Sequence, residues 1–202
     1  HRTSFRIIDR DGNTVQRREW LSDQSPDAAE KGDYAHYMLK EIHEQPRAVA
    51  QTLEERVAGG KLLEAAFGPA AQAVFAKTEA VRIVACGTSF HAATVAKYFI
   101  EQICRLPCWV EIASEYRYRN PVVPKNTLFV SVSQSGETAD TLAALRMAKQ
   151  AGYLSQLAIC NVPESSLVRE SDLVMLTRAG PEIGVASTKA FTTQLTALGM
   201  LV

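Results

Sequence analysis

Three short segments rich in serine, threonine and glycine carry the side chains best suited to chemistry. They are Gly87-Thr88-Ser89, the run from Ser133 to Thr138 (SQSGET), and the run from Gly184 to Thr188 (GVAST). Each precedes a stretch with helical periodicity, and the first two directly follow short apolar runs typical of strands. Hydrogen-bond donors gathered where helices begin are suited to holding an anion.

A phosphate group fits this pattern. The first backbone N–H groups of a helix are free, and they face an anion together with the positive end of the helix dipole. Serine, threonine and glutamine side chains add neutral donors, and Gly136 allows the backbone to approach closely. The segments contain no Lys or Arg, and Lys189 follows only after the third. Anion binding would therefore depend on dipoles and hydroxyl groups.

Simpler interpretations remain open for these residues. Serine and threonine are favourable N-cap residues, so Ser89 or Thr138 alone indicates a helix start as readily as a binding site. Both segments together, each placed after a strand, favour binding. The chain has no G-x-x-x-x-G-K-[ST] loop and no G-x-G-x-x-G run, which argues against a Walker A site and against a dinucleotide site.

Other polar residues are weaker candidates. His91 could move a proton, Glu182 could act as a base near the third segment, and Lys189 could pair with an anion. A structural histidine, a solvated loop glutamate and a lysine on a helix surface are the simpler interpretations. The run 115–119 mixes aromatic residues with arginine and could stack on RNA bases, although packing or subunit contact is simpler. No His, Cys, Asp and Glu set has metal-ligand spacing, so no metal site is predicted.

An alternation of strands and helices must position these segments. From residue 81 onward, strands are expected at 81–86, 108–113, 127–132, 155–160 and 172–176, and helices at 89–104, 138–151, 167–171 and from about 187. The alternation predicts an α/β fold, a three-layer sandwich in which helices cover both faces of a parallel sheet. Ligands of such sheets bind outside the carboxyl ends of the strands, where the Ser/Thr segments fall.

A hairpin and helices are expected before this sheet. Asp11-Gly12-Asn13 lies between two short alternating runs and predicts a hairpin at residues 4–18. From Asp33 the pattern becomes helical, and Pro46 is expected to begin a second helix that ends at Gly59-Gly60. A third helical patch, residues 62–76, is interrupted at Gly68-Pro69.

Composition limits the classes of protein that fit. The 202 residues, 47% of them hydrophobic, suffice for one sizeable core. The 22 Lys and Arg balance the 22 Asp and Glu, which argues against a nucleic-acid or membrane-surface protein. No apolar run approaches the ~20 residues of a membrane span. Cys86 and Cys160 are expected to be small buried residues, and cysteines without a C-x-x-C pair favour a reduced, cytoplasmic compartment.

Several motifs resemble one family. CGTS at 86–89, SQSGET at 133–138, AICNVPESSLVRES at 158–171 and EIGVASTKAFTTQ at 182–194 are similar to the glutamine–fructose-6-phosphate aminotransferases, also called glucosamine-6-phosphate synthases. GDYAHYMLKEIHEQP at 32–46 and VEIASEYRYR at 110–119 are similar too. SQSGET alone would indicate only a sugar isomerase (SIS) domain, which is flavodoxin-like in fold.

The resemblance implies how the chain is organised. Residues 1–18 would be the last hairpin of a glutaminase domain, 19–32 a linker between domains, and 33–80 helices that lead into the sheet. Residues 81–202 would be the first of two SIS domains, so the chain would be a piece of a longer, cytoplasmic, homodimeric enzyme. That enzyme converts fructose 6-phosphate and glutamine to glucosamine 6-phosphate and glutamate, and the resemblance implies no cofactor. Its partners in the chain would be the glutaminase domain and the second SIS domain.

The resemblance also assigns roles to the Ser/Thr segments. Matched by motif, the phosphate contacts are Ser89, Ser133, Gln134, Ser135 and Thr138, and the sugar contacts are Thr88, Val185 and Ser187. The family's catalytic residues come later in the sequence, so none is assigned here and this stretch alone is expected to be inactive. A sugar-phosphate sensor and a stand-alone phosphosugar isomerase are the alternatives, and the hairpin and linker argue against both.

Overall fold

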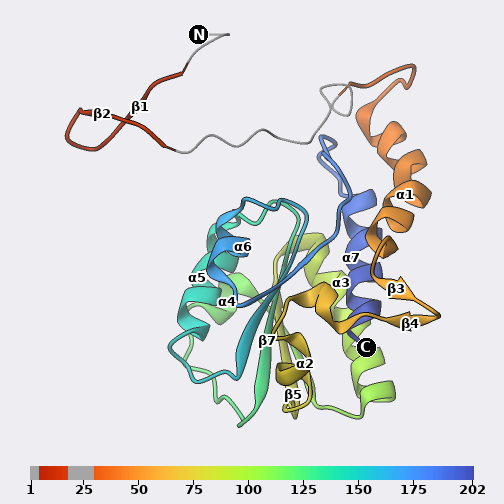
Figure 1. The fold of residues 1–202 in the computed structure, drawn as a ribbon, viewed down its shortest axis with the longest axis vertical. Coiled ribbons are helices and arrows are strands. Elements are labelled where there is room, and N and C mark those ends of the chain that lie inside the picture. The colour runs from red at the N-terminus through yellow and green to blue at the C-terminus, as the bar shows by residue number, and fades with distance from the viewer. Residues whose placement is uncertain (1–4, 18–29) are drawn as a thin grey trace.

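Five short apolar segments form one parallel sheet in the computed structural model, which describes residues 5–17 and 30–202 (Figure 1). The strand order is β6-β5-β7-β8-β9, and every neighbouring pair is parallel. The three inner strands β5, β7 and β8 are buried along their whole length, as continuous apolar runs predict. The strands are β5 (Ala80–Ala85), β6 (Cys108–Ile112), β7 (Thr127–Ser133), β8 (Ser155–Cys160) and β9 (Leu173–Leu176).

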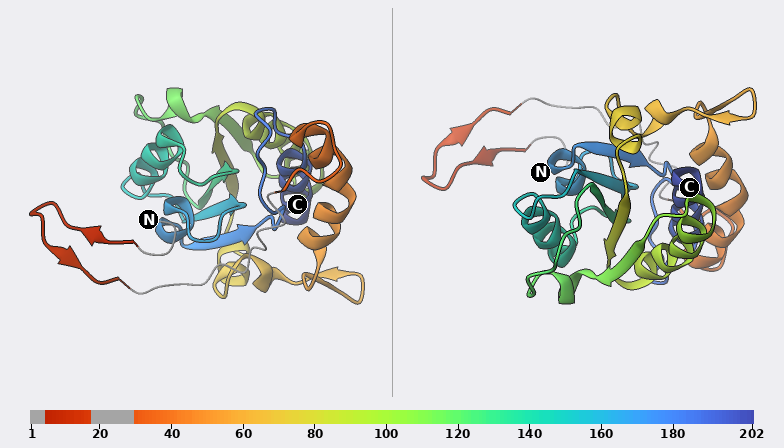
Figure 2. Two further views of the ribbon diagram at one scale, coloured as in Figure 1. Left: turned by 90° about the horizontal axis from the view of Figure 1, so that it is seen from above. Right: turned by 90° about the horizontal axis from the view of Figure 1, so that it is seen from below.

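Helices cover both faces of the sheet (Figure 2). Alternate residues of a strand point to opposite faces, so Ile83 and Val84 of β5 belong to different cores. This arrangement confirms the three-layer α/β prediction. The helices of the sheet region are α3 (Gly87–Phe99) with a π-helical turn at Ile100–Cys104, α4 (Ala113–Tyr116), α5 (Ala139–Ala148), α6 (Ser166–Glu170) and α7 (Lys189–Leu201).

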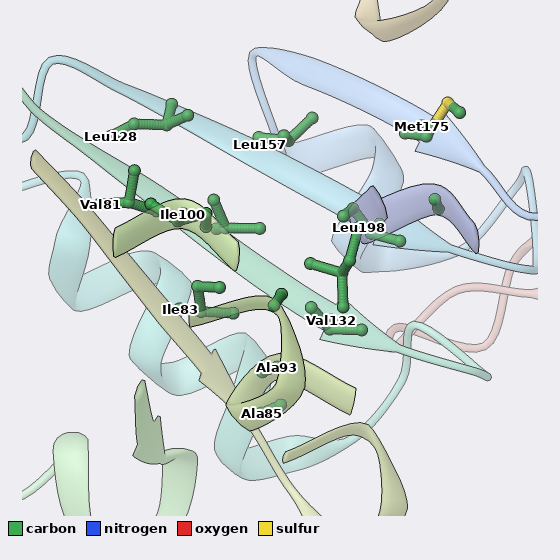
Figure 3. Packing of buried hydrophobic residues seen from close by; sticks show 14 of the residues in the cluster. Val81, Ile83, Ala85, Ala93, Ile100, Leu128, Val132, Leu157, Met175 and Leu198 are labelled. Atoms are coloured by element: carbon green, nitrogen blue, oxygen red, sulfur yellow. The ribbon is translucent and has the colours of Figure 1, made fainter. Parts of the chain in front are cut away.

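Helices α3 and α7 pack on the first face (Figure 3). Ala93 of α3 and Leu198 of α7 lie against Ile83 and Val132 of the inner strands, and Ile100 extends this contact past the end of α3. Small alanines on α3 let the helix approach the sheet closely. The opposite face is covered by α4, α5 and α6. Both cores therefore hold the starts of α3 and α5 near the carboxyl ends of β5 and β7.

Helix α1 (Tyr37–Leu53) lies alongside α7 (Figure 1) and runs through Pro46 without a break. The expectation that Pro46 begins a second helix is therefore wrong, and so is the expected start at Asp33. Proline lacks the N–H that would bond to the carbonyl of Ile42, four residues earlier. The side-chain amide of Gln45 donates to that carbonyl at 3.1 Å. This bond satisfies the Ile42 carbonyl, which the proline would otherwise leave without its helical donor.

The region between α1 and the sheet is less helical than the periodicity predicts. Gly59 and Gly60 have φ of 59° and 74°, and they form the turn of a small hairpin rather than a helix end. Its strands are β3 (Val57–Ala58) and β4 (Lys61–Leu62). The interruption predicted at Gly68 is confirmed, because it separates the 3₁₀ helix η2 (Glu64–Phe67) from α2 (Ala71–Phe75).

The N-terminal hairpin is confirmed, with β1 (Ile7–Ile8) antiparallel to β2 (Thr14–Val15). The Asp9 carboxylate accepts hydrogen bonds from the N–H groups of Asp11 and Asn13, both at 2.9 Å, and so closes the turn. Most of the expected linker, 19–32, lies outside the described residues. Within the described part of the chain, no helix is long and apolar enough to cross a membrane.

Candidate functional site

A pocket of about 230 Å³ lies at the carboxyl ends of β5 and β7. All eight residues that the sequence analysis assigned to ligand contacts line it, so the structure brings together every one of them. The lining residues are Cys86, Thr88, Ser89, Val132, Ser133, Gln134, Ser135, Thr138, Thr141, Glu182, Gly184, Val185 and Ser187. Three separate loops contribute, which matches the expected gathering of the Ser/Thr segments at one sheet edge.

The first loop joins β5 directly to α3. Gly87 has φ of +56°, a left-handed conformation that glycine adopts without strain, and it turns the chain from strand to helix within one residue. Cys86, Thr88 and Ser89 consequently lie at the start of α3 beside the pocket. Cys86 is half-buried, so its expected role as a buried small residue is wrong, whereas Cys160 is fully buried as expected.

The second loop is folded by its own hydroxyl groups. The N–H of Gly136 donates to the hydroxyl oxygen of Ser133 at 3.0 Å, and that oxygen lies 3.4 Å from the hydroxyl of Thr138. The N–H of Glu137 donates to the Ser135 hydroxyl oxygen at 3.2 Å. Gly136 has φ of +68°. The hydroxyl groups of Ser133, Ser135 and Thr138 are thereby held at the start of α5.

Glu137, the acidic member of SQSGET, faces a different element. Its carboxylate accepts a hydrogen bond of 2.7 Å from the N–H of Ser166, the first residue of α6. Hydrogen bonding from Ser166 holds the pKa of Glu137 below its ordinary value. The negative charge of this loop is therefore directed to α6, while its hydroxyl groups line the pocket.

The starts of α3 and α5 at the pocket carry no side-chain caps. Cys86 and Thr138 occupy the N-cap positions of α3 and α5, and neither side chain makes a capping hydrogen bond. The interpretation of Ser89 and Thr138 as simple N-caps is therefore wrong, because neither side chain caps a helix. Uncapped N–H groups at the first turn of a helix seek other acceptors, and an anion in the pocket is suitably placed.

The third loop is tied to α7 by Glu182. Its Oε1 accepts hydrogen bonds from the N–H groups of Thr188 and Ala190 at 2.8 and 3.1 Å, and its Oε2 accepts from the hydroxyl of Ser187 at 3.2 Å. The interpretation of Glu182 as a solvated loop glutamate is therefore wrong. A carboxylate at a helix N-terminus satisfies free N–H groups and complements the dipole.

Lys189 is buried rather than on a helix surface, which corrects the expectation. It is 3% exposed, and its Nζ lies 2.6 Å from Oε2 of Glu44 on α1. The long side chain crosses from α7 to α1, where a carboxylate is available to compensate its charge. Lys189 does not line the pocket.

The remaining candidates lie elsewhere. His91 is exposed on α3 and does not line the pocket. In the run 115–119, Arg117 pairs with Asp140 at 2.7 Å, Arg119 pairs with Glu111 at 2.6 Å, and Tyr116 is buried. These contacts favour the packing interpretation over stacking on RNA. Residues 5–17 and 30–202 contain no group of three or more His, Cys, Asp and Glu that could hold a metal ion.

Sequence reasoning missed Thr141 and Glu41. Thr141 lies on α5 one turn after Thr138 and lines the pocket, and its buried hydroxyl finds no hydrogen-bond partner in the part of the chain described. Its spacing of three residues from Thr138 could have indicated the shared helix face. Glu41 bonds to the third loop from 142 residues away, and no local pattern signals such a contact.

Comparison with known proteins agrees with this geometry. Residues 75–202 match the model of the SIS domain family. Glutamine–fructose-6-phosphate aminotransferase [isomerizing] of Pseudomonas aeruginosa is 60% identical over 200 residues, and that of Escherichia coli K12 is 55% identical over 201 residues. These alignments cover 99% and 100% of this chain but 33% of each relative, so the chain spans about a third of the length of these curated relatives.

The solved structures that match show the same fold. The C-terminal domain of glucosamine-fructose-6-phosphate aminotransferase from Francisella tularensis has a TM-score of 0.83 and 57% identity over 86% of this chain and 48% of that one. Tagatose-6-phosphate ketose/aldose isomerase from Escherichia coli has a TM-score of 0.66 at 21% identity and covers 80% of this chain and 46% of that one. The second likeness supports the fold alone.

The fold and the loops at the strand ends define an α/β domain with a polar pocket at the carboxyl ends of its parallel strands. The chain belongs to the SIS domain family. Over nearly its whole length it is also similar to part of the glutamine–fructose-6-phosphate aminotransferases, which confirms the resemblance seen in the motifs.

Proposed function

We propose that this chain is part of the isomerase half of a glutamine–fructose-6-phosphate aminotransferase and that its pocket binds fructose 6-phosphate and glucosamine 6-phosphate. The observation that carries the proposal is the convergence of eight donor-rich and contact residues on one pocket at the uncapped starts of α3 and α5. Relatives at 55–61% identity are glutamine–fructose-6-phosphate aminotransferases, which supports the reaction.

The phosphate is held by neutral donors in this proposal. Ser89 belongs to the first turn of α3, and Ser133, Gln134, Ser135 and Thr138 surround the start of α5. Thr88 adds a contact to the sugar from the first loop, and Val185 and Ser187 add contacts from the third. Binding energy at the phosphate then fixes the carbons that react, so that acid–base groups elsewhere in the enzyme can move a proton between them.

The rest of the enzyme completes the reaction in this proposal. Residues 1–18 end a glutaminase domain, 19–32 link it to the helices of 33–80, and 81–202 form the first of two SIS domains. The glutaminase domain and the second SIS domain are partners within one longer chain, which acts in the cytoplasm as a homodimer. The coverage of about a third of each curated relative supports this larger organisation.

Calorimetric titration of the purified protein tests the site. Fructose 6-phosphate and glucosamine 6-phosphate should bind, whereas fructose and glucosamine should not. Replacing both Ser135 and Thr138 with alanine should weaken binding by roughly tenfold or more, because a hydrogen bond to a charged group contributes about 1.5–3 kcal/mol. Thr94→Ala is the matched control, because the Thr94 hydroxyl bonds within α3 to the carbonyl of Phe90.

Three results would contradict the proposal. If the double variant binds sugar phosphates as tightly as the unaltered protein, the phosphate site has been misplaced. If the chain alone forms glucosamine 6-phosphate from ammonia and fructose 6-phosphate, or interconverts another phosphosugar, the catalytic residues lie within these 202 residues. Interconversion of another phosphosugar would favour a stand-alone isomerase. Sugar-phosphate binding by a full-length protein that catalyses no reaction would instead favour a sensor.

A further inference from the structure

Glu41 is a buried carboxylate that lies outside the pocket yet contacts a loop that lines it. The residue is 2% exposed on α1. Its Oε1 accepts hydrogen bonds from the N–H groups of Ile183 and Gly184 at 2.6 and 3.1 Å, and its Oε2 lies 3.2 Å from the Gly184 nitrogen. Hydrogen bonds to an ionised acceptor are roughly twice as strong as neutral ones.

The loop is shaped to receive this carboxylate. A Cβ atom added at Gly184 would lie 2.5 Å from Oε2 of Glu41 and 3.4 Å from Cα of Met38. A side chain at residue 184 would therefore displace the Glu41 carboxylate from its present position. Gly184 on the loop and Glu41 on α1 thus form one close contact.

Two other ties hold the same loop. The side chain of Asn161 accepts from the N–H of Ala179 at 2.7 Å and donates to the carbonyl of Gly180 at 2.8 Å, which fixes the approach to the loop. Glu182 fixes its far end through Thr188 and the first turn of α7. The pocket residues Val185 and Ser187 lie between the Glu41 contact and this far end.

We infer that Glu41 is a positioning residue that sets how far the loop 182–188 reaches over the pocket, and thereby the contacts of Val185 and Ser187 with the sugar. The inference deepens the proposed function and rests on it. The phosphate-binding loops 86–89 and 133–138 lead into α3 and α5 and donate no hydrogen bond to Glu41. Loss of the hydrogen bonds to Glu41 should thus weaken the contacts with the sugar and leave the contacts with the phosphate unchanged. A displacement of about 1 Å in such a loop is enough to matter for orientation.

Amide hydrogen exchange in the ligand-free protein tests the tie directly. Glu41→Gln keeps the size of the side chain and removes its charge, and it should speed exchange at the amides of Ile183 and Gly184 at least tenfold. Gly184→Ala perturbs the same contact from the loop side and should give the same pattern, so the test does not depend on one variant folding. Glu101→Gln, at an exposed surface pair with Lys97, is the matched control and should change nothing.

Calorimetry with two probes then tests the function of the tie. Glu41→Gln should weaken fructose 6-phosphate binding about tenfold and leave the affinity for inorganic phosphate within twofold. Equal losses for both probes would mean general destabilisation, and no loss for either would mean that the loop needs no such tie; both results overturn the inference. If the unaltered protein binds inorganic phosphate but no hexose phosphate, the proposed function fails instead, and the exchange rates still decide whether Glu41 holds the loop.

Discussion

Replacing Gly136 with alanine should destabilise the protein strongly, because this glycine lies in the most crowded turn of the pocket. Its φ is +68°, and an added Cβ would lie 2.1 Å from Oγ and 2.5 Å from Cβ of Ser165, and 2.8 Å from Sγ of Cys160. Real Cβ atoms do not come this close to other atoms. The carbonyl of Gly136 also accepts the N–H of Leu167, so a shift of the turn would pull on α6.

The loss of stability in Gly136→Ala has two parts. A residue with a side chain in the left-handed region costs about 1–2 kcal/mol. Forcing one extra carbon into a packed interior costs about 1–3 kcal/mol more. Gly136→Ala should therefore lower the free energy of unfolding by about 2–5 kcal/mol, of which the second part comes from Ser165 and Cys160.

Urea denaturation separates the two parts when a second glycine serves as control. Gly152 has φ of +83°, and an added Cβ there meets nothing within 4 Å, so Gly152→Ala should show only the conformational cost. Adding Ser165→Gly to Gly136→Ala should recover part of the loss, because it removes the two nearest atoms. A Gly136→Ala variant that loses no more stability than Gly152→Ala would refute the reasoning.

Three further predictions concern buried polar groups. Thr141→Val should raise the free energy of unfolding by about 1 kcal/mol in urea denaturation, because it removes a buried hydroxyl for which the described residues offer no partner. Lys189→Met should lower it by about 2 kcal/mol, less than the ~3–5 kcal/mol of a fully buried pair, because Glu44 is only half-buried; Lys97→Met, at a more exposed pair, should cost less. Burial raises the pKa of Cys108 to about 12, so its thiol stays neutral at pH 8 and should resist alkylation by iodoacetamide until the protein unfolds, as peptide mass spectrometry would show.

The sheet and the pocket could be predicted because their signals are local. Runs such as residues 81–86 and 127–132 are apolar over the length of one strand, and each is followed at once by glycine or hydroxyl residues and a helix. Parallel strands then place these ends at one edge without any knowledge of long-range contacts. Topology thus predicts that the loops gather at one edge, and the eight residues that the family resemblance assigned to ligand contacts all line the pocket there.

Two wrong predictions in the helical region before the sheet have local causes. Pro46 reads as a helix start, but Gln45 supplies the donor that the proline removes, and α1 continues. The sequence predicts that Gly59-Gly60 ends a helix, yet both glycines adopt positive φ and form the turn of a hairpin instead. In both places the neighbouring residues determine the backbone conformation, and a prediction from general helix propensities does not take them into account.

The polar residues that hold the third loop could not be predicted, because their partners are far away in the sequence. Lys189 and Glu44 are 145 residues apart, and Glu41 and Ile183 are 142 apart. On α1, Glu41 and Glu44 follow the same charged pattern as a solvated helix face. Only the packing of α1 on α7 shows that this face is buried and that it supports the pocket.

The lining of the pocket also predicts how binding should respond to salt. None of its described lining residues is Lys or Arg, and the carboxylate of Glu182 is among them. The 22 Lys and Arg of the chain are balanced by 22 Asp and Glu, so no excess positive charge draws a phosphate dianion to it. Short contacts with helix N–H and hydroxyl groups in a confined site are screened far less than exposed charges. The affinity for fructose 6-phosphate should therefore change by less than about threefold between 50 and 500 mM NaCl, whereas a cationic site would weaken steeply over that range. A steep loss in calorimetric titrations would mean that a lysine or arginine outside this lining reaches the ligand, and the assignment of binding to dipoles and hydroxyl groups would fail.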